Sequence, residues 1–230
     1  MTSLELLRRH DGYSRWIWDR VRAFGSFGGR VLEVGCGIGN FTDLFLDEES
    51  VDTLHVVEPD VTYVEGVRAR IDDERFRAFC STAAAFEPDG GGYDRVVSFN
   101  VLEHIENDRQ ALQSIERALV PGGEAWILVP AHPALFSELD RGLSHYRRYT
   151  RAGLRALARD VGLEPMAVSH FNPVGAVGWW VTGRVLRARV LPSSQVRFYS
   201  CYGITISRWV DRLNPFPIGI SLVARLRKPD

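Results

Sequence analysis

The sequence predicts an α/β fold in which a mostly parallel sheet carries helices on both faces. Apolar, strand-like runs alternate with helix-like segments from residue 30 to about residue 170, as in sheets whose strands are joined by helical crossovers. A glycine-rich turn follows the first strand, and the second strand ends in an acid about 20 residues later. With 230 residues, 45% of them hydrophobic and 25% charged, the chain is expected to form one globular domain over residues 1–230.

The first strand runs directly into a turn with the pattern Gly35-x-Gly37-x-Gly39, preceded by Glu33. The glycines allow a sharp turn and let a ligand lie against bare backbone, while the helix that begins near Asn40 directs its positive end at that ligand. Nicotinamide and flavin sites use a similar turn, but their fingerprint places its third glycine where this chain has Asn40. Glu33 also suits a ligand with an amino group better than a pyrophosphate. Both details favour S-adenosylmethionine over a dinucleotide.

The remaining elements follow in order. The second strand is expected at 53–58 and the fourth near 93–101, where it leads into a polar loop. Helices are expected near 40–49, 61–70, 107–119 and 150–160. The third helix has a buried stripe and stops at Pro121-Gly122-Gly123, which cannot continue a helix; the stripe is Leu112, Ile115, Ala118 and Leu119. The last strand, 218–226, is expected to present one apolar face: Ile218, Ile220, Leu222, Ala224 and Leu226.

Four motifs together resemble the class I S-adenosylmethionine-dependent methyltransferases, in particular small-molecule enzymes with a Leu-Glu-His loop after the fourth strand. The motifs are the Glu33 glycine turn, Glu58, Leu102-Glu103-His104 and Leu119-Val120-Pro121-Gly122-Gly123. The resemblance covers roughly residues 10–170 and the final strand. It implies a Rossmann-like, seven-stranded, mostly parallel sheet with an antiparallel last strand inserted beside the fifth. It also implies S-adenosyl-L-methionine as the cofactor.

The resemblance implies roles for individual residues on the cofactor side. The glycine turn, with Glu33, Gly35, Gly37 and Gly39, is expected to hold the methionine part of the cofactor. Glu58 is expected to bind the ribose, and Asn100, at the end of the fourth strand, is assigned to the cofactor as well. Where the family has an Asp that bonds the adenine amino group, this chain has Thr82, or alternatively Ser81, whose hydroxyl can accept the same hydrogen bond.

Residues 1–28 resemble the N-terminal helix that covers the cofactor in this family. Tyr13 is then a candidate partner of the cofactor carboxylate. The alternative is an aromatic helix packed on the sheet, which is expected to account for at least one of Trp16 and Trp18.

Methyl transfer from a sulfonium depends mainly on alignment, and it needs a base only if the acceptor must lose a proton. His104, His145 and Tyr146 are the catalytic candidates, and His132, after the fifth strand, is a weaker one. The alternative for His104 is packing beside the cofactor, because Leu-Glu-His loops occur with unlike acceptors. No metal site is expected. The three cysteines show no metal-ligand spacing, and their odd number fits a reducing, cytoplasmic compartment.

Residues 171–217 form a long link between the last two strands, which we interpret as an insertion. It contains Trp179 and Trp180 beside Arg184, Arg187 and Arg189. The alternatives are a wall of the substrate pocket, a cover helix or homodimer contact, and a peripheral contact with a membrane surface. No apolar run is long enough to span a bilayer.

The acceptor pocket is expected between residues 132–149 and the Trp179-Trp180 region. Arg147 or Arg148 would then supply a fixed charge for an acidic or amphipathic small molecule. The alternative is that these arginines pair with Asp140 and Glu138. A net charge of -1 offers no general attraction for nucleic acid. The sequence thus predicts a methyltransferase that transfers a methyl group to an oxygen, or alternatively a nitrogen, of a small molecule. The alternative function is a non-catalytic cofactor-binding module or partner subunit.

Overall fold

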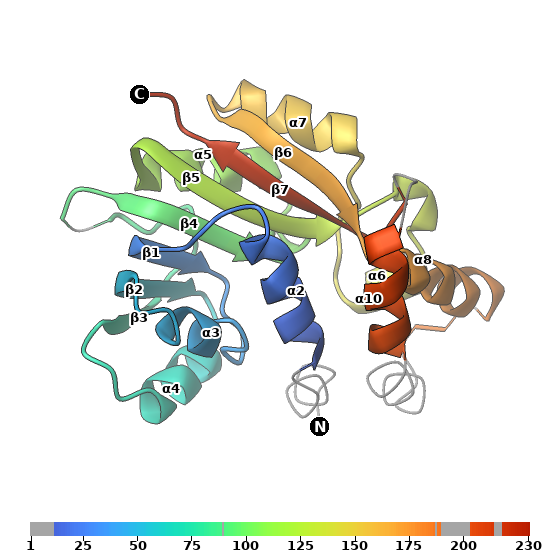
Figure 1. Ribbon diagram of the computed structural model, residues 1–230, viewed down its shortest axis with the longest axis horizontal. Coiled ribbons are helices and arrows are strands. Elements are labelled where there is room, and N and C mark those ends of the chain that lie inside the picture. The colour runs from blue at the N-terminus through green and yellow to red at the C-terminus, as the bar shows by residue number, and fades with distance from the viewer. Residues whose placement is uncertain (1–11, 89, 187, 190–202, 214–217) are drawn as a thin grey trace.

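The computed structural model describes residues 12–88, 90–186, 188–189, 203–213 and 218–230 (Figure 1). Seven strands form one sheet in the order β3-β2-β1-β4-β5-β7-β6. They are β1 (Gly29–Val34), β2 (Val51–Glu58), β3 (Phe76–Cys80), β4 (Tyr93–Phe99), β5 (Leu119–Pro130), β6 (Glu164–Phe171) and β7 (Ser221–Arg227). The pairs among β1 to β5 are parallel, whereas β7 runs antiparallel to both β5 and β6. The predicted seven-stranded sheet, with its last strand inserted beside the fifth, is confirmed.

Helices cover both faces of this sheet, as predicted. On one face α5 and α7 pack through residues such as Leu112 and Leu154, and on the other α2, α3 and α4 pack through Trp18, Phe45 and Val64. The α-helices are α2 (Gly12–Arg22), α3 (Thr42–Leu46), α4 (Val61–Arg70), α5 (Asp108–Ala118), α6 (Glu138–Gly142), α7 (Arg151–Asp160), α8 (Pro173–Trp180) and α10 (Ile204–Leu213). Short 3₁₀ helices span Leu102–His104 and Pro133–Leu135, and a π-helical turn spans Val181–Val185.

Element ends follow from local chemistry and differ from the sequence prediction in three places. Helix α3 starts at Thr42 and ends at Leu46, so it is shorter than expected. Helix α5 ends at Ala118 because the next residue already adopts extended backbone and pairs with β4, so Pro121-Gly122-Gly123 belongs to β5. Strand β7 starts at Ser221, so Ile218, which is 50% exposed, and Ile220 precede it, and its buried face is Leu222, Ala224 and Leu226.

The N-terminal helix α2 is an aromatic helix buried against the sheet. Trp16 packs on Phe171 with ring centroids 4.3 Å apart, and Trp18 stacks on Phe27 at 5.0 Å. Both tryptophans are buried, which confirms the packing interpretation for each of them. The first eleven residues of the expected 1–28 lid region lie outside the described residues.

Along the chain, helix α8, the π-helical turn and helix α10 follow β6 and precede β7, within the expected 171–217 insertion (Figure 1). Helix α10 contacts both α8 and α2, so this part of the chain reaches the N-terminal helix. Arg187 and Cys201 lie outside the described residues. Across the described ranges, no helix combines the length and the apolar character needed to cross a membrane.

Candidate active site

The carboxyl ends of β2, β1 and β4 lie side by side at one edge of the sheet, because these three strands are parallel neighbours. The chain leaves β1 toward β2 and later returns to the other side of β1 as β4, which makes this position the switch point where open α/β sheets bind ligands. A hollow of about 470 Å³ lies at the opposite, amino edge, with Arg30, Asp52 and Arg75 in its wall. None of the predicted site residues lines it. The candidate site is therefore at the carboxyl edge.

The glycine turn, Gly35–Gly39, packs directly against the loop that follows β4. Gly35 has φ +79°, and a Cβ there would clash with Val101 Cγ2, so only glycine allows this approach. Gly37 has φ +51°, but a Cβ there would meet no atom within 4 Å. The turn is thus closed toward the loop at Gly35 and open toward a ligand at Gly37.

Glu58, at the end of β2, is fixed to the glycine turn by backbone hydrogen bonds. The Gly37 N–H donates to Glu58 Oε2 at 3.0 Å, and the Asp60 N–H donates to Oε1 at 3.1 Å. Asp60 itself caps α4 by accepting from the Thr62 N–H. Because an ionised carboxylate offers about four acceptor positions, two of them remain for ligand hydroxyls.

Glu33 is almost fully buried in β1, with 3% of its surface exposed. The Thr42 hydroxyl donates to Glu33 Oε2 at 2.6 Å. Burial raises the pKa of Glu33 to about 8, although the Thr42 hydrogen bond acts in the opposite direction. The carboxyl group is therefore largely protonated at neutral pH, and its contact with a ligand amino group stays a prediction.

The other residues predicted to hold the cofactor lie around the same edge. Asn100 follows β4 with φ +56° and donates its N–H to the Leu128 carbonyl, which fixes its backbone, and its side chain is exposed. Thr82 is exposed just after β3, where its hydroxyl accepts from the Ala85 N–H. Tyr13 lies on α2, with its ring edge against Trp16. Their contacts with a cofactor remain predictions.

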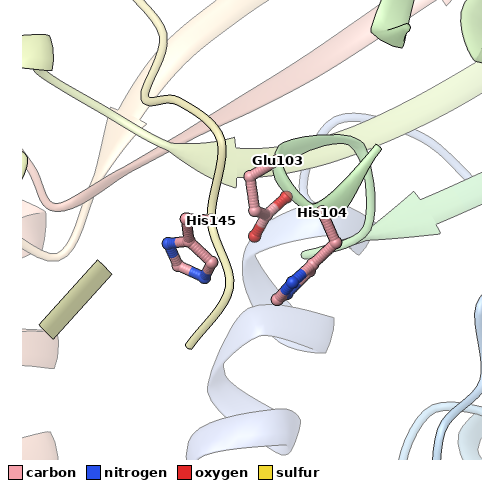
Figure 2. A group of neighbouring side chains, drawn as sticks. All are labelled: Glu103, His104 and His145. Atoms are coloured by element: carbon pink, nitrogen blue, oxygen red, sulfur yellow. The ribbon is translucent and has the colours of Figure 1, made fainter. Parts of the chain in front are cut away.

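His104 and His145, which we call the imidazole pair, meet although they are far apart in the sequence. Their ring centroids are 4.7 Å apart and the rings are nearly perpendicular. Figure 2 shows His104 and Glu103 on the loop after β4 and His145 on the segment that leads to α7, all three directed at a common space. The Tyr146 N–H donates to the Glu103 carbonyl at 2.8 Å and joins the two segments. The Tyr146 side chain is 54% exposed, near the Arg147 guanidinium.

His145 is held by a buried carboxylate. Its Nδ1 lies 3.0 Å from Asp140 Oδ1, and Asp140 is fully buried. Asp140 also accepts the Ser137 N–H at 2.9 Å, which closes a capping box at the start of α6. Burial acts to raise the pKa of Asp140, but the hydrogen bond from His145 and the charge of Arg148 outweigh it and lower the pKa.

Two further donors complete this group, which we call the Asp140 network: Asp140, Ser137, His145, Arg148 and Trp179. Arg148 Nε donates to Asp140 Oδ1 at 2.6 Å, and Trp179 Nε1 donates to Oδ2 at 3.2 Å. The Arg148 guanidinium lies 4.6 Å from the centre of the Trp179 ring. Helix α8 is thereby attached to the 132–149 segment, and the acceptor pocket expected between them stays a prediction.

Arg148 does not supply a charge to an acceptor, which corrects one sequence prediction. It is only 5% exposed and uses its guanidinium on Asp140 and on the Ala131 carbonyl. Arg147 pairs with Asp108 at 2.9 Å. The alternative, that these arginines anchor the segment through ion pairs, is confirmed for Arg148, with Asp108 in place of Glu138 as the partner of Arg147.

Burial and neighbouring charge set the protonation of the groups beside the imidazole pair. Glu103 is 1% exposed, and burial raises its pKa to about 8. The pKa of His104 is lowered, mainly because part of the ring is removed from water and also because a charge on His145 would repel it. This imidazole is therefore neutral at physiological pH. His132 belongs to a different pair, stacked on His170 with centroids 4.9 Å apart.

The sequence analysis does not bring Glu103, Asp140 and Trp179 together around His145. The capping-box pattern Ser137-x-x-Asp140 is visible in the sequence and predicts that Asp140 is held in a fixed position. Glu103 lies inside a motif that was interpreted through its histidine. No local signal joins Trp179 to Asp140, because 39 positions separate them.

Comparisons with known proteins agree with this geometry. A family model described as a methyltransferase domain matches residues 8–168. An uncharacterized methyltransferase of Mycobacteroides abscessus is 28% identical over 211 residues, covering 78% of this chain and 79% of the relative. A ubiquinone biosynthesis O-methyltransferase of Erwinia tasmaniensis is 29% identical over 188 residues, covering 76% and 68%. A solved S-adenosylmethionine-dependent methyltransferase from Mesorhizobium loti superposes with a TM-score of 0.64 at 15% identity, covering 92% of this chain and 97% of that one, which shows a shared fold.

Proposed function

The chain belongs to the class I S-adenosylmethionine-dependent methyltransferases, and we propose that it methylates a hydroxyl oxygen of a small amphipathic molecule. The observation that carries this proposal is the contact between the glycine turn and the loop after β4. Gly35 lies against Val101, and Val101 is three residues before His104. The glycine turn that is proposed to bind the cofactor is therefore next to the loop that carries His104. A methyl group held at the turn would face groups able to receive a proton.

The residues around the glycine turn fit the cofactor. Gly37 leaves room for a ligand on its open side, and Glu58 is held in place with acceptor positions to spare for the two ribose hydroxyls. When bound, S-adenosylmethionine supplies a methyl group that its sulfonium already activates. The glycine turn and Glu58 then have to bind and align, and alignment alone removes much of the barrier in such reactions.

The imidazole pair supports oxygen as the accepting atom. A hydroxyl must lose its proton during methylation, and His104 is a neutral imidazole with an exposed edge at the site. His145 is oriented by Asp140, whose lowered pKa keeps it ionised and places the ring proton on Nδ1. Its other nitrogen is then an acceptor, as in hydrolases where a carboxylate orients a catalytic histidine. The Erwinia tasmaniensis relative, named an O-methyltransferase, also supports this choice.

An apolar body suits the acceptor better than an acidic group does. Arg147 and Arg148 both use their charge within the protein. Helix α8, which is attached to the 132–149 segment, instead exposes Val177 at 64% and Trp180 at 51%. Exposed apolar side chains on a helix attached to the segment of His145 favour an acceptor with one apolar and one polar end.

The proposal is tested by incubating the protein with S-adenosylmethionine and a panel of hydroxylated small molecules that have apolar bodies. Mass spectrometry follows S-adenosylhomocysteine and the position of the new methyl group. We expect turnover with at least one hydroxyl acceptor and a methyl group on its oxygen. Tight cofactor binding without turnover across the panel would contradict the proposal and favour a non-catalytic binding module. Methylation only at nitrogen would contradict the oxygen assignment.

A further inference from the structure

Glu103, His104 and His145 bring one carboxylate and two imidazoles to a common space (Figure 2). One ligand atom from each side chain lies within 4.8 Å of the other two. Bonds of about 2.0–2.2 Å to a transition metal would place such atoms roughly 3–3.5 Å apart, so side-chain shifts of about 1 Å close the site. We propose that this group, the Glu–His–His trio, binds a divalent transition-metal cation.

The first supporting observation is an unpaired oxygen. Glu103 is 99% buried, and among the described residues its Oε2 has no hydrogen-bond partner. A buried carboxyl oxygen without a partner costs free energy, and proteins tolerate it where a ligand completes the group. The Glu103 carboxyl group is directed at the space that His104 and His145 share (Figure 2).

The second observation is the fixed tautomer of His145. Asp140 accepts hydrogen bonds from Arg148, Trp179 and the Ser137 backbone, so it acts as an acceptor toward His145 as well. The neutral form of His145 then carries its proton on Nδ1, which leaves the Nε2 lone pair free for a cation. A carboxylate that binds the far nitrogen of a histidine is the usual support of a metal-ligating imidazole.

The donor set indicates the kind of cation. Two imidazoles with one carboxylate suit first-row transition metals such as Zn²⁺, Mn²⁺ or Fe²⁺ better than Mg²⁺ or Ca²⁺, which prefer oxygen. Three protein ligands leave positions open, as in catalytic sites. His104 is exposed, so the cation and an acceptor can both reach the trio from solvent.

The role of the cation, unlike its binding, rests on the proposed function. An acceptor hydroxyl in an open position would lose its proton to solvent more readily, because a divalent cation lowers the pKa of a bound oxygen. The oxygen then forms a bond to the methyl carbon, and the electron pair of the breaking carbon–sulfur bond stays on sulfur. In this arrangement His104 and His145 would assist the proton loss assigned to them above through the cation to which they are ligands. Such a site departs from the expectation, stated in the sequence analysis, that the protein has no metal site.

Co²⁺ is a suitable probe, because its visible spectrum separates nitrogen and oxygen ligands from thiolates such as Cys80. The chelator-treated full chain is titrated with Co²⁺ and followed by absorbance and calorimetry. We expect one Co²⁺ per chain, and His104→Ala, Glu103→Ala and His145→Ala should each weaken binding at least about tenfold. His104 is exposed, so its variant tests the site without disturbing buried packing. His132→Ala is the matched control, since it also breaks a histidine pair but should bind Co²⁺ as the wild type does.

The proposal is overturned if no Co²⁺ binds up to about 1 mM, if the spectrum shows thiolate ligation, or if His104→Ala binds Co²⁺ as tightly as the wild type. An equal loss in His132→Ala also overturns it. These outcomes are independent of methyl transfer. Co²⁺ binding without turnover would support the metal site and count against the proposed function. Turnover in a protein that binds no Co²⁺ would support the proposed function and overturn the metal site.

Discussion

Glu58 is held by two backbone N–H groups, one from Gly37 in the glycine turn and one from Asp60, whereas the Asp140 network holds His145 through side chains from three separate segments of the chain. The first arrangement lies within residues 35–60, at the ends of two neighbouring strands. The second needs α6, the 143–149 segment and α8 to come together. One region is thus built from backbone N–H groups at the ends of two neighbouring strands, and the other from buried charged side chains joined by a tryptophan 39 positions away.

This difference predicts how each region responds to mutation. At the glycine turn, backbone conformation and a single carboxylate matter, so changes should affect cofactor affinity with little effect on the rest of the fold. In the Asp140 network, a buried ion pair supports the site, so changes should affect stability and turnover together. Variants chosen in pairs can separate the two behaviours.

The largest effect is expected at the imidazole pair. His145→Ala and His104→Ala should each lower kcat by about 10²–10⁴-fold, the usual loss when a group that assists proton removal is deleted. S-adenosylmethionine affinity should stay close to wild type, because the cofactor is held by the glycine turn and Glu58. Turnover assays and calorimetric titration give the two numbers. A kcat near the wild-type value in both variants would show that the imidazole pair takes no part in catalysis.

The next effect concerns stability. Asp140→Asn leaves Arg148 buried without its counter-charge, and we expect a loss of about 3–5 kcal/mol in the free energy of unfolding. Urea unfolding followed by circular dichroism measures it. Glu138→Gln is the matched control: its ion pair with Arg141 lies at the surface, so the loss should stay under about 1 kcal/mol. Equal losses in the two variants would show that the network is no more important than a surface pair.

A smaller effect is expected at Glu58. Glu58→Ala should weaken S-adenosylmethionine binding by at least about tenfold, since each charge-assisted hydrogen bond contributes about 1.5–3 kcal/mol. Calorimetric titration measures this loss, and Glu65→Ala, an exposed acid on α4, serves as the control. Wild-type affinity in a folded Glu58→Ala protein would exclude the ribose-binding role.

The last prediction concerns Gly37, where we expect a small effect on stability. Gly37→Ala should cost about 1–2 kcal/mol, because an L side chain must adopt φ near +51° there. The added Cβ meets no protein atom, so its main consequence should be a loss of cofactor affinity. Gly66→Ala, inside α4 and also in open space, should keep affinity and raise stability by up to about 1 kcal/mol. Unchanged affinity in Gly37→Ala would show that the ligand does not lie against this turn.

The same contrast explains what the sequence could predict. The sheet, its helices and the glycine turn were predictable, because alternation of apolar segments and a glycine pattern act over short stretches. Thr150 caps α7 through an equally local contact, since its side chain accepts from the Gly153 N–H. Asp140 and Arg148 were considered together only as one alternative, because the burial that makes their pairing strong depends on Trp179 and α8. The metal-binding geometry of Glu103 depends on His145, 42 positions away in the chain.

The central claim is that the glycine turn presents the reactive end of the cofactor to the imidazole pair. A crystal structure of the protein with S-adenosylhomocysteine tests this directly. We predict that the ribose hydroxyls bind Glu58, and that the sulfur lies on the side of His104 and His145. A sulfur directed away from these histidines, or a ligand bound in the hollow at the amino edge of the sheet, would contradict the account.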